Sequence, residues 1–321
     1  EPQETDEPAA SADDWNLILA NPWTKLPDGY TVELTQLRYF QTAAYYQHIS
    51  RAAEELNISQ PALSTMISRL EKELGVPLFD HNGRSIILNQ NGQRFLQRVN
   101  HILMEVENSK RELQDIADEG DNSISLAVSS SQFLQGMHAF MYQHPNYKWN
   151  QRVAENKEIA ALLNRGQIDL AVTSPGIYGE VFESTLLLRD IFKLAVHKDN
   201  PLAQRKSVRL EELTDQRFIM LLKGLPFRTQ TDRIFADLGI TPHYIMECDH
   251  LLRRELINAN AGVTIASQSA SFRHLFSENI RFLDIEDVYH TRDIVMVHRK
   301  GRYLNRASRQ FADFLKQKFS P

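Results

Sequence analysis

Residues 50–84, SRAAEELNISQPALSTMISRLEKELGVPLFDHNGR, decide how the N-terminal part of this 321-residue chain folds. Small and apolar residues recur at helical spacing on both sides of Asn57, which can adopt the left-handed conformation that ends a helix. Ser59 is a good N-cap for a second helix, and Pro61 is tolerated in a first helical turn, where a missing N–H costs little. The stretch therefore predicts two short helices joined by a tight bend.

The second of these helices has an apolar face and a polar face. The buried stripe is predicted to consist of Leu63, Met66, Ile67, Leu70 and Leu74. The opposite face carries Gln60, Ser64, Thr65, Ser68 and Arg69. Such short or hydrogen-bonding side chains let a helix approach base edges in the DNA major groove, which is about 12 Å wide, and the helix N-terminus directs a positive dipole at phosphates. An ordinary helical hairpin with a solvated polar face is the alternative interpretation.

After Gly75 the chain continues VPLFDHNGRSIIL, which contains two apolar runs around Asn82-Gly83. An Asn-Gly pair in this setting is the strongest short signal of a β-hairpin. The hairpin would place Arg84, and His81 with it, on a wing that can contact the DNA backbone or the minor groove. Helix, helix and hairpin in this order predict a winged helix-turn-helix, and hence gene regulation rather than catalysis.

The whole stretch resembles the LysR-type transcriptional regulators, whose pattern is A-A-x-x-L, then S-Q-P-A-L-S, I-x-x-L-E, L-G and L-F. The matching residues are Ala52-Ala53, Leu56, Ser59-Gln60-Pro61-Ala62-Leu63-Ser64, Ile67, Leu70-Glu71, Leu74-Gly75 and Leu78-Phe79. Two positions depart from the pattern. His81 stands where the family usually has Arg, which makes wing contact there weaker or dependent on pH. Asn89 replaces a Thr that caps the following helix, and Asn caps equally well.

We expect eight side chains of this region to contact double-stranded promoter DNA. They are Arg51, Gln60, Pro61, Ser64, Thr65, Arg69, His81 and Arg84. No catalytic residue, cofactor or metal site is predicted, so the protein is not expected to be an enzyme.

The composition fits a soluble protein with two domains. Apolar residues make up 42 % of the chain and charged residues 24 %, and no apolar run is long enough to span a bilayer. Cys248 is the single cysteine, which excludes an internal disulfide and a multi-cysteine zinc site and fits a reducing cytoplasm. The net charge of −5 is unevenly distributed, since residues 1–34 carry −7 and the remainder +2. A mildly basic DNA-binding domain would need a few well-placed Arg and Lys side chains, which a dimer would double.

Residues 1–33 precede the first predicted helix and are expected to form an acidic, largely disordered extension. Residues 13–33 resemble the lead-in to the catalytic domain of a D-alanyl-D-alanine carboxypeptidase. That similarity rests on Asp14-Trp15, Leu17-Ile18-Leu19, Asn21-Pro22-Trp23 and Leu26-Pro27 through Tyr30. None of that enzyme's zinc-ligand motifs follow, so no peptidase activity is inferred. Our hypothesis is a fused leader or a misassembled reading frame, and a natural regulatory extension is the alternative.

From Gly92 to Gly120 the chain is predicted to form one long helix, and residues 93–120 are assigned to a linker. Its apolar positions alternate three and four apart, a heptad seam that Lys110 interrupts. The seam consists of Leu96, Val99, Leu103, Val106, Lys110, Leu113 and Ala117. The LysR resemblance implies a dimerisation helix here, and packing of an amphipathic helix on its own domain is the alternative. Paired DNA-binding domains would bind half-sites spaced by helical turns.

Residues 121–321 alternate predicted strands and helices, which is typical of an open α/β sheet. Strands are expected at 123–129, 169–174, 217–222, 243–248, 262–267 and 292–298, and helices near 132–143, 156–164 and 304–319. The resemblance implies a two-subdomain, periplasmic-binding-protein-like effector domain. Subdomain 1 would comprise about 121–194 and 291–321, and subdomain 2 about 195–290. Crossover strands near 191–197 and 292–298 would join them.

We expect a small-molecule effector to bind between the subdomains, because open α/β sheets bind ligands beyond the carboxyl ends of strands. Ser129, Ser130 and Ser131 follow the first strand, where they could hold a carboxylate or simply cap a helix. Asn156 and Ser174 occupy comparable positions. Lys223, which precedes a helix of the second subdomain, could attract an anionic effector or could be a plain exposed lysine. Arg228 resembles an Arg common in the family and could instead be structural.

Two further interpretations concern cysteine. The peroxide-sensing branch of the family has a reactive cysteine and a partner near Lys223, and this chain has neither, which argues against a disulfide switch. Cys248 with His250 and His243 could suggest a metal site or a nucleophile–base pair. Because no second thiol or orienting carboxylate is evident, we expect Cys248 to end a strand as a small buried residue.

Three functions are compatible with these patterns. The first is a LysR-type regulator that forms a dimer or tetramer, contacts RNA polymerase if it is an activator, and has no membrane partner. The second is a cell-wall peptidase, which rests only on residues 13–33. The third is a solute-binding module with an accidental helix-turn-helix, which would lack the salt-dependent DNA affinity that phosphate contacts produce.

Overall fold

The structure is a computed structural model that describes residues 32–82, 85–117, 122–134, 136–267 and 276–319. The chain divides into two compact units, residues 1–103 and 104–321, and the boundary falls within helix α5 (Gln90–Ile116). The predicted fold class is confirmed, since the elements form a winged helix-turn-helix, a long helix and a two-lobed α/β domain. None of the described helices has the length and apolar character needed to cross a lipid bilayer.

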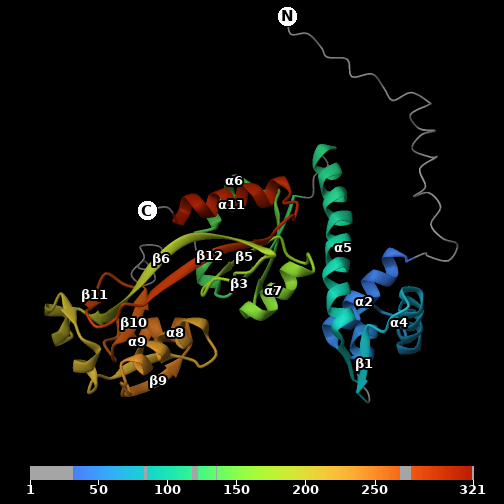
Figure 1. Cartoon of the computed structure of the whole chain (residues 1–321). Helices are drawn as coiled ribbons and strands as arrows, with labels where there is room; N and C mark the ends of the chain where they lie inside the picture. Colours follow the sequence, from blue (N-terminus) through green and yellow to red (C-terminus); the bar gives the residue numbers. More distant parts are fainter. Residues whose placement is uncertain (1–31, 83–84, 118–121, 135, 268–275, 320–321) are drawn as a thin grey trace, which may run out of the picture. The chain divides into compact units, whose positions relative to one another are not determined.

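In the described part of the first unit, helices α2 (Leu34–Tyr46), α3 (Ile49–Glu55) and α4 (Gln60–Leu74) pack on one apolar core (Figure 1). Asn57 between α3 and α4 has a positive φ of 54°, and the Ser59 hydroxyl accepts a hydrogen bond from the Ala62 N–H at 3.4 Å. Both features of the bend were predicted. Of the predicted stripe on α4, Leu63, Ile67 and Leu70 are buried, whereas Met66 and Leu74 are only half-buried.

Strands β1 (Phe79–Asn82) and β2 (Ser85–Leu88) form the predicted antiparallel hairpin, with Asn82 paired to Ser85. A Glu71 carboxylate oxygen on α4 accepts hydrogen bonds from the N–H groups of Leu78 at 2.7 Å and Phe79 at 3.2 Å. This carboxylate therefore attaches the beginning of the wing to the helix that precedes it.

Helix α5 begins at Gln90, two residues earlier than expected, and the predicted Asn89 cap is present, since its Oδ1 accepts from the Gly92 N–H at 2.9 Å. Gly92 lies against the entry to the wing. A Cβ atom there would be 2.1 Å from the carbonyl oxygen of Leu78 and 2.6 Å from Cδ2 of Leu88. Only glycine therefore allows this close approach of the helix to the hairpin.

The predicted heptad seam of α5 has two different environments. Val99 is buried, and Leu96 and Leu103 are half-buried, in the core of the first unit. Val106 and Leu113, in the second unit, are 42 % and 67 % exposed. The first half of the seam thus packs on its own domain, which was the alternative interpretation, and the second half stays open.

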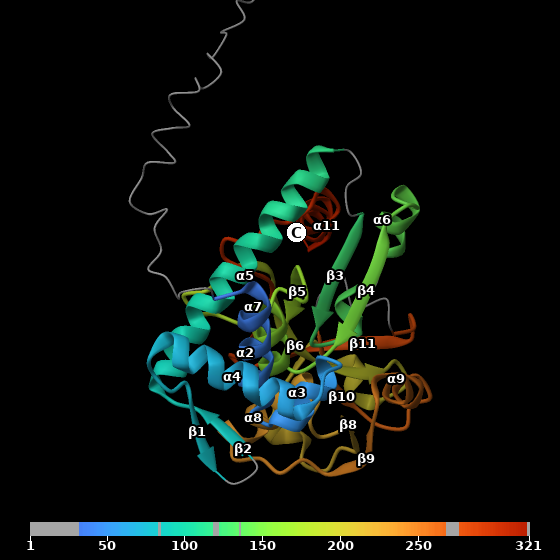
Figure 2. The same ribbon diagram turned by 90° about the vertical axis from the view of Figure 1, so that its right-hand side faces the viewer.

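In the second unit, the first lobe is a sheet of strand order β4-β3-β5-β12-β6. Strands β3 (Ser123–Val128), β4 (Lys148–Val153) and β5 (Leu170–Thr173) are parallel neighbours (Figure 2). Helix α11 (Arg306–Phe319) packs on one face through Phe311 and Leu315, and α7 (Asn156–Asn164) packs on the other. Two further helical elements of this lobe lie among the described residues, η2 (Ser131–Leu134) and α6 (His138–Gln143).

The second lobe is joined to the first by strands β6 (Phe182–His197) and β12 (Thr291–Arg299), which lie side by side (Figure 1). Strand β6 pairs with β12 as far as Ile191 and with strands of the second lobe from Phe192 onward. The described elements of the second lobe are η3 (Pro201–Gln204), β7 (Ser207–Val208), η4 (Leu210–Leu213), β8 (Phe218–Leu221), α8 (Pro226–Asp237), β9 (Tyr244–Cys248), α9 (His250–Asn258), β10 (Thr264–Ser267) and β11 (Ile280–Ile285). Helices α8 and α9 pack on opposite sides of β8.

One predicted helix, near Gln132–Gln143, is interrupted. The chain instead forms η2 and then α6, and Gly136 between them has a φ of +78°. A residue in the left-handed region cannot continue a right-handed helix, so the prediction of a single helix was wrong.

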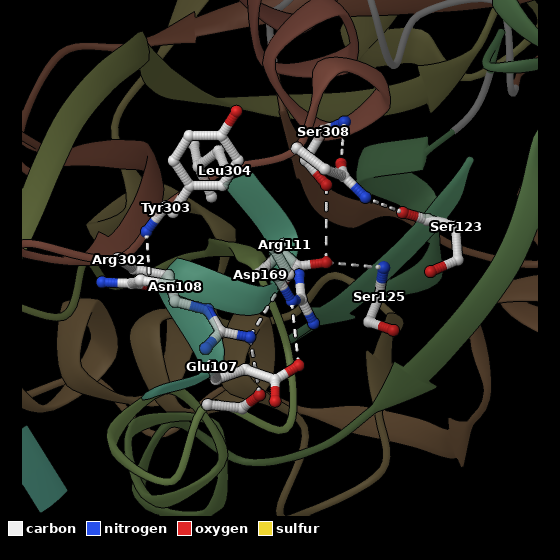
Figure 3. A network of polar contacts seen from close by, with 12 residues as sticks. Glu107, Asn108, Arg111, Ser123, Ser125, Asp169, Arg302, Tyr303, Leu304 and Ser308 are labelled. Carbon is white, nitrogen blue, oxygen red and sulfur yellow. Dashed lines mark hydrogen bonds and ion pairs between the residues drawn. The ribbon is translucent and has the colours of Figure 1, made fainter. Parts of the chain in front are cut away.

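A buried carboxylate, Asp169, joins α5 to the C-terminal domain (Figure 3). Asp169 is 1 % exposed, and its two oxygens contact Arg111 of α5 at 2.5 Å, Arg302 at 3.5 Å and the Ser308 hydroxyl at 3.4 Å. The backbone N–H of Ser125 on β3 donates to it at 3.3 Å. A single side chain thus contacts the long helix, the sheet and α11.

The same face of α5 makes further polar contacts with the loop after β12. The Asn108 amide donates to the Gly301 carbonyl at 2.7 Å, and its oxygen accepts from the Tyr303 N–H at 2.8 Å (Figure 3). The Tyr303 hydroxyl donates to Asp115 at 3.0 Å. The C-terminal half of α5, which belongs to the second unit, is therefore attached to the rest of that unit by directional hydrogen bonds.

Candidate nucleic-acid interface and ligand cleft

The polar face of α4 is accessible. Gln60, Pro61, Thr65 and Arg69 are exposed, as is Arg51 on α3, while Ser64 is half-buried. The Ser50 hydroxyl lies 3.0 Å from Gln60 Oε1, which links the first turn of α4 to α3. The described part of the chain therefore brings six of the eight predicted DNA contacts onto two adjacent helices.

The other two predicted contacts lie in the wing. His81 pairs with Ile86 in the hairpin, but its side chain lies outside the described residues. Arg84 lies entirely outside them.

The charge of this region differs from our expectation. Residues 34–92 contain five basic and five acidic residues, so their net charge is zero. The prediction of a mildly basic DNA-binding domain was therefore wrong. Arg69 additionally forms an ion pair with Glu73 at 2.9 Å. Any attraction to phosphates must therefore come from the positions of individual cations rather than from an excess of positive charge.

Three adjoining cavities, of about 210, 720 and 120 Å³, lie between the two lobes of the second unit. Arg292 lines all three. The predicted effector-binding residues Ser129, Ser130, Ser131 and Ser174 line the smallest cavity, and Asn156 and Ser174 line the largest. Lys223 is exposed and is not among the described residues that line these cavities.

Two of the predicted serine hydroxyls bond to the backbone. The buried Ser129 Oγ accepts from the Ser174 N–H at 3.0 Å, and Ser130 Oγ accepts from the Gln132 N–H at 3.4 Å. The Asn156 amide donates to the Pro175 carbonyl at 2.9 Å, and its buried Oδ1 has no partner among the described residues. Ser131 is exposed at the cleft.

The sequence did not place three titratable residues, Arg253, His250 and Arg292, in the ligand cleft, and His250 was considered only as a partner of Cys248. Burial lowers the pKa of both Arg253 and Arg292 to about 10. Burial, together with the nearby charges of Arg253 and Arg292, lowers the pKa of His250 to about 4, so this ring is neutral at pH 7. Arg253 lies four residues before the buried Ile257 on α9, and this spacing was the only signal in the sequence that the arginine faces inward.

The family comparisons cover both units. The model described as "Bacterial regulatory helix-turn-helix protein, lysR family" matches residues 34–93, and the model "LysR substrate binding domain" matches residues 118–320. The chain belongs to the LysR family. This LysR-type protein is a DNA-binding transcriptional regulator with an effector-binding domain, and not an enzyme.

Similar proteins extend over most of this LysR-type chain. The uncharacterised HTH-type transcriptional regulator YybE of Bacillus subtilis (strain 168) is 31 % identical over 294 residues, which cover 90 % of this chain and 100 % of the relative. The RuBisCO operon transcriptional regulator of Allochromatium vinosum is 25 % identical and is covered to 95 %, with 88 % of this chain aligned. A solved full-length OxyR variant from Pseudomonas aeruginosa has the same fold, with a TM-score of 0.58 at 20 % identity over 90 % of this chain and 95 % of its own.

Neither family model covers the N-terminal extension, residues 1–33. The helix-turn-helix family model begins at residue 34, and the comparisons do not support the resemblance of residues 13–33 to a carboxypeptidase lead-in. Residues 1–31, including those predicted to be disordered, lie outside the described part of this LysR-type chain.

Two further residues of the second lobe of this LysR-type chain, Cys248 and Arg228, are buried. Cys248 ends β9 and is buried, as predicted, and burial raises the pKa of its thiol. Arg228 is buried on α8, where it donates to the Leu221 carbonyl and forms ion pairs with Asp232 at 2.6 Å and Glu247 at 2.7 Å. Arg228 therefore has a structural role in the second lobe.

Proposed function

We propose that this regulator reads promoter DNA with α4 and the β1–β2 wing, and that a small-molecule effector in the interlobe cleft changes that binding. The observation that supports the first part is the α4 surface, where a capped helix N-terminus and an exposed polar face stand on a closed apolar core. We assign DNA binding to residues 34–92 and effector binding to residues 121–321. We place the protein in the cytoplasm, where the DNA of a bacterium is found.

Gln60 provides the first test. Its amide can form two hydrogen bonds with an adenine edge, so Gln60→Ala should remove discrimination worth about 1–3 kcal/mol between the operator and unrelated DNA. Arg51→Ala should instead weaken binding to both DNAs equally and make the dependence of log affinity on log salt less steep. Fluorescence anisotropy with both duplexes at several salt concentrations measures these effects. Equal loss on the two duplexes for Gln60→Ala would show that this residue does not contact bases.

The same measurement separates the regulator from a solute-binding module. A module with an accidental helix-turn-helix would show no salt-dependent affinity for any duplex. An affinity that falls steeply with salt supports the proposed function.

We further propose that the exposed half of α5 mediates self-association into a dimer or tetramer. Val106, Leu113 and Ile116 recur at spacings of seven and three, and the last two are 67 % and 74 % exposed. Leu113→Lys should shift the protein toward the monomer, because it places a charge in an apolar seam. Analytical ultracentrifugation checks this, with Lys110→Ala as a control that leaves the apolar surface intact. A parent protein that is already monomeric would refute the assignment.

Within the cleft, we propose that Ser131, Asn156 and Ser174 contact the effector. Ser129 and Ser130 shape the same wall through their backbone bonds. If the protein activates transcription, we expect RNA polymerase to be a further partner.

A further inference from the structure

One hydrogen bond crosses the bend between the two helices of the helix-turn-helix. The Ser50 hydroxyl on α3 donates to Oε1 of Gln60, in the first turn of α4, at 3.0 Å. The hydroxyl is the donor, because an amide carbonyl oxygen has no hydrogen to give. Within the described part of the chain, the Gln60 side chain makes no other hydrogen bond, so its amide nitrogen remains free to donate.

Both ends of this bond are placed by the apolar core of the first unit. Ala53 lies three residues after Ser50 and is 2 % exposed, and Leu63 lies three residues after Gln60 and is fully buried. Asn57 turns the chain between the two helices with a φ of 54°. The backbone positions that carry the two side chains are therefore fixed relative to one another by packing.

The two side chains differ in their conformational freedom. The serine hydroxyl is one rotatable bond from the backbone, so its position follows from that of α3. The glutamine amide is three rotatable bonds from the backbone, and ordering such a side chain costs conformational entropy. The amide oxygen accepts hydrogen bonds whereas the nitrogen donates them. By accepting from Ser50, the Gln60 amide loses part of its freedom in the absence of DNA and presents its oxygen and nitrogen in a fixed order.

A neighbouring side chain on the same exposed surface is ordered in a different way. The Thr65 hydroxyl donates to the Pro61 carbonyl at 2.9 Å, so this bond lies within α4 itself. The bond to Gln60 comes instead from another helix. Because residues 34–92 carry no net charge, their nonspecific attraction to phosphates is small. A pre-arranged base contact therefore contributes more, in proportion, to the choice of a DNA site.

We propose that Ser50 is a positioning residue for base recognition, which holds the Gln60 amide in the orientation that reads a base edge. The inference rests on the proposed binding of DNA by α4 and adds a residue that need not touch a base itself. Adenine presents N7 as an acceptor and its N6 amino group as a donor, and only one orientation of the glutamine amide matches both. The carbonyl oxygen has two lone pairs, so it can accept from Ser50 and from the base at the same time.

The test uses the full chain and an operator that the chain itself selects from a randomised pool of duplexes. The base pair that Gln60→Ala no longer distinguishes identifies the position read by Gln60. Four duplexes that differ only at this base pair are then titrated by fluorescence anisotropy. We expect Ser50→Ala to lower the preference for the best base pair about 3- to 10-fold, which corresponds to the cost of ordering one flexible side chain on binding. Ser50→Thr keeps the hydroxyl and should retain the preference of the parent.

A double-mutant cycle shows whether Ser50 acts through Gln60. In the Gln60→Ala background, Ser50→Ala should have no further effect on base preference, because the amide that it orients is absent. The dependence of affinity on salt should match the parent, since serine carries no charge. The Tm of Ser50→Ala should also match the parent, because an exposed hydrogen bond is readily replaced by bonds to water. Ser109→Ala, which removes an exposed hydroxyl from α5, is the control for loss of a helical serine.

Several outcomes would overturn the role of Ser50. An equal loss of affinity for all four duplexes would assign the serine to the DNA backbone, and a lower Tm of Ser50→Ala would assign it to the stability of the fold. An unchanged base preference, an undiminished effect in the Gln60→Ala background, or a Ser50→Thr variant that behaves like Ser50→Ala would contradict the proposal as well.

The two levels of the argument fail separately. If Gln60→Ala loses base discrimination while Ser50→Ala keeps it, α4 reads DNA as proposed and only the role of Ser50 is wrong. If Gln60→Ala keeps its discrimination, α4 is not docked as proposed and the inference falls with that docking. If the parent protein binds no duplex at low salt, the proposed function itself fails.

Discussion

Asp169→Asn should cost the C-terminal unit about 3–5 kcal/mol, because it leaves Arg302 and Arg111 without their buried charge partner. The Arg302 side chain is 1 % exposed, and burial already lowers its pKa, so an uncompensated charge there is especially unfavourable. The Ser308 hydroxyl and the Ser125 N–H lose a charged acceptor at the same time. Urea unfolding followed by circular dichroism measures the change.

Asp293→Asn is the matched control. Asp293 forms an ion pair with Arg189 at 2.9 Å, but the arginine side chain is 61 % exposed. Exposed pairs of this kind contribute about 0–1 kcal/mol. Similar losses for the two variants would show that the Asp169 contacts do not anchor α5 to the domain.

Gly92→Ala should destabilise the first unit by about 3 kcal/mol or more and abolish DNA binding. The added methyl group would lie 2.1 Å from the Leu78 carbonyl oxygen, which is backbone and cannot rotate away, so the wing or the start of α5 must move. Gel shift with operator DNA and a two-transition thermal melt test this. The C-terminal unit should melt at the parent temperature.

Gly75→Ala provides the comparison. Gly75 ends α4 with a φ of +73°, but nothing lies within 4 Å of the position of its missing Cβ. Its replacement therefore costs only the backbone preference, about 1–2 kcal/mol. If Gly75→Ala proves as damaging as Gly92→Ala, steric contact is not the cause.

Local signals allowed the helix-turn-helix to be predicted from the sequence. Asn57, Ser59 and Asn89 act within a few residues of their own position, and each has the predicted conformation or cap. The hairpin between Phe79 and Leu88 formed for the same reason. The interruption at Gly136 was missed because a single glycine inside an apolar periodic run does not reveal its φ.

The ligand cleft was harder to predict because it depends on contacts between distant segments. Arg253 and Arg292 lie 39 residues apart in the chain, and each resembles an ordinary surface arginine in its local context. The serines after the first strand could be recognised as candidates in the sequence. The hydrogen bond from the Ser174 N–H to the Ser129 hydroxyl could not, because it depends on the pairing of β3 with β5. An arginine that is buried where two lobes meet cannot be recognised from the residues next to it in the sequence.

The uninterrupted passage of β6 from one lobe to the other restricts how this domain can respond to a ligand. Two paired strands resist being pulled apart at their ladder of hydrogen bonds, but they tolerate changes in twist. We therefore expect closure around an effector to change the twist of the β6–β12 ribbon rather than to rotate the two lobes about a flexible hinge. The irregularity in pairing at Ile294 and Val295 lies in this ribbon and marks where the torsion can concentrate.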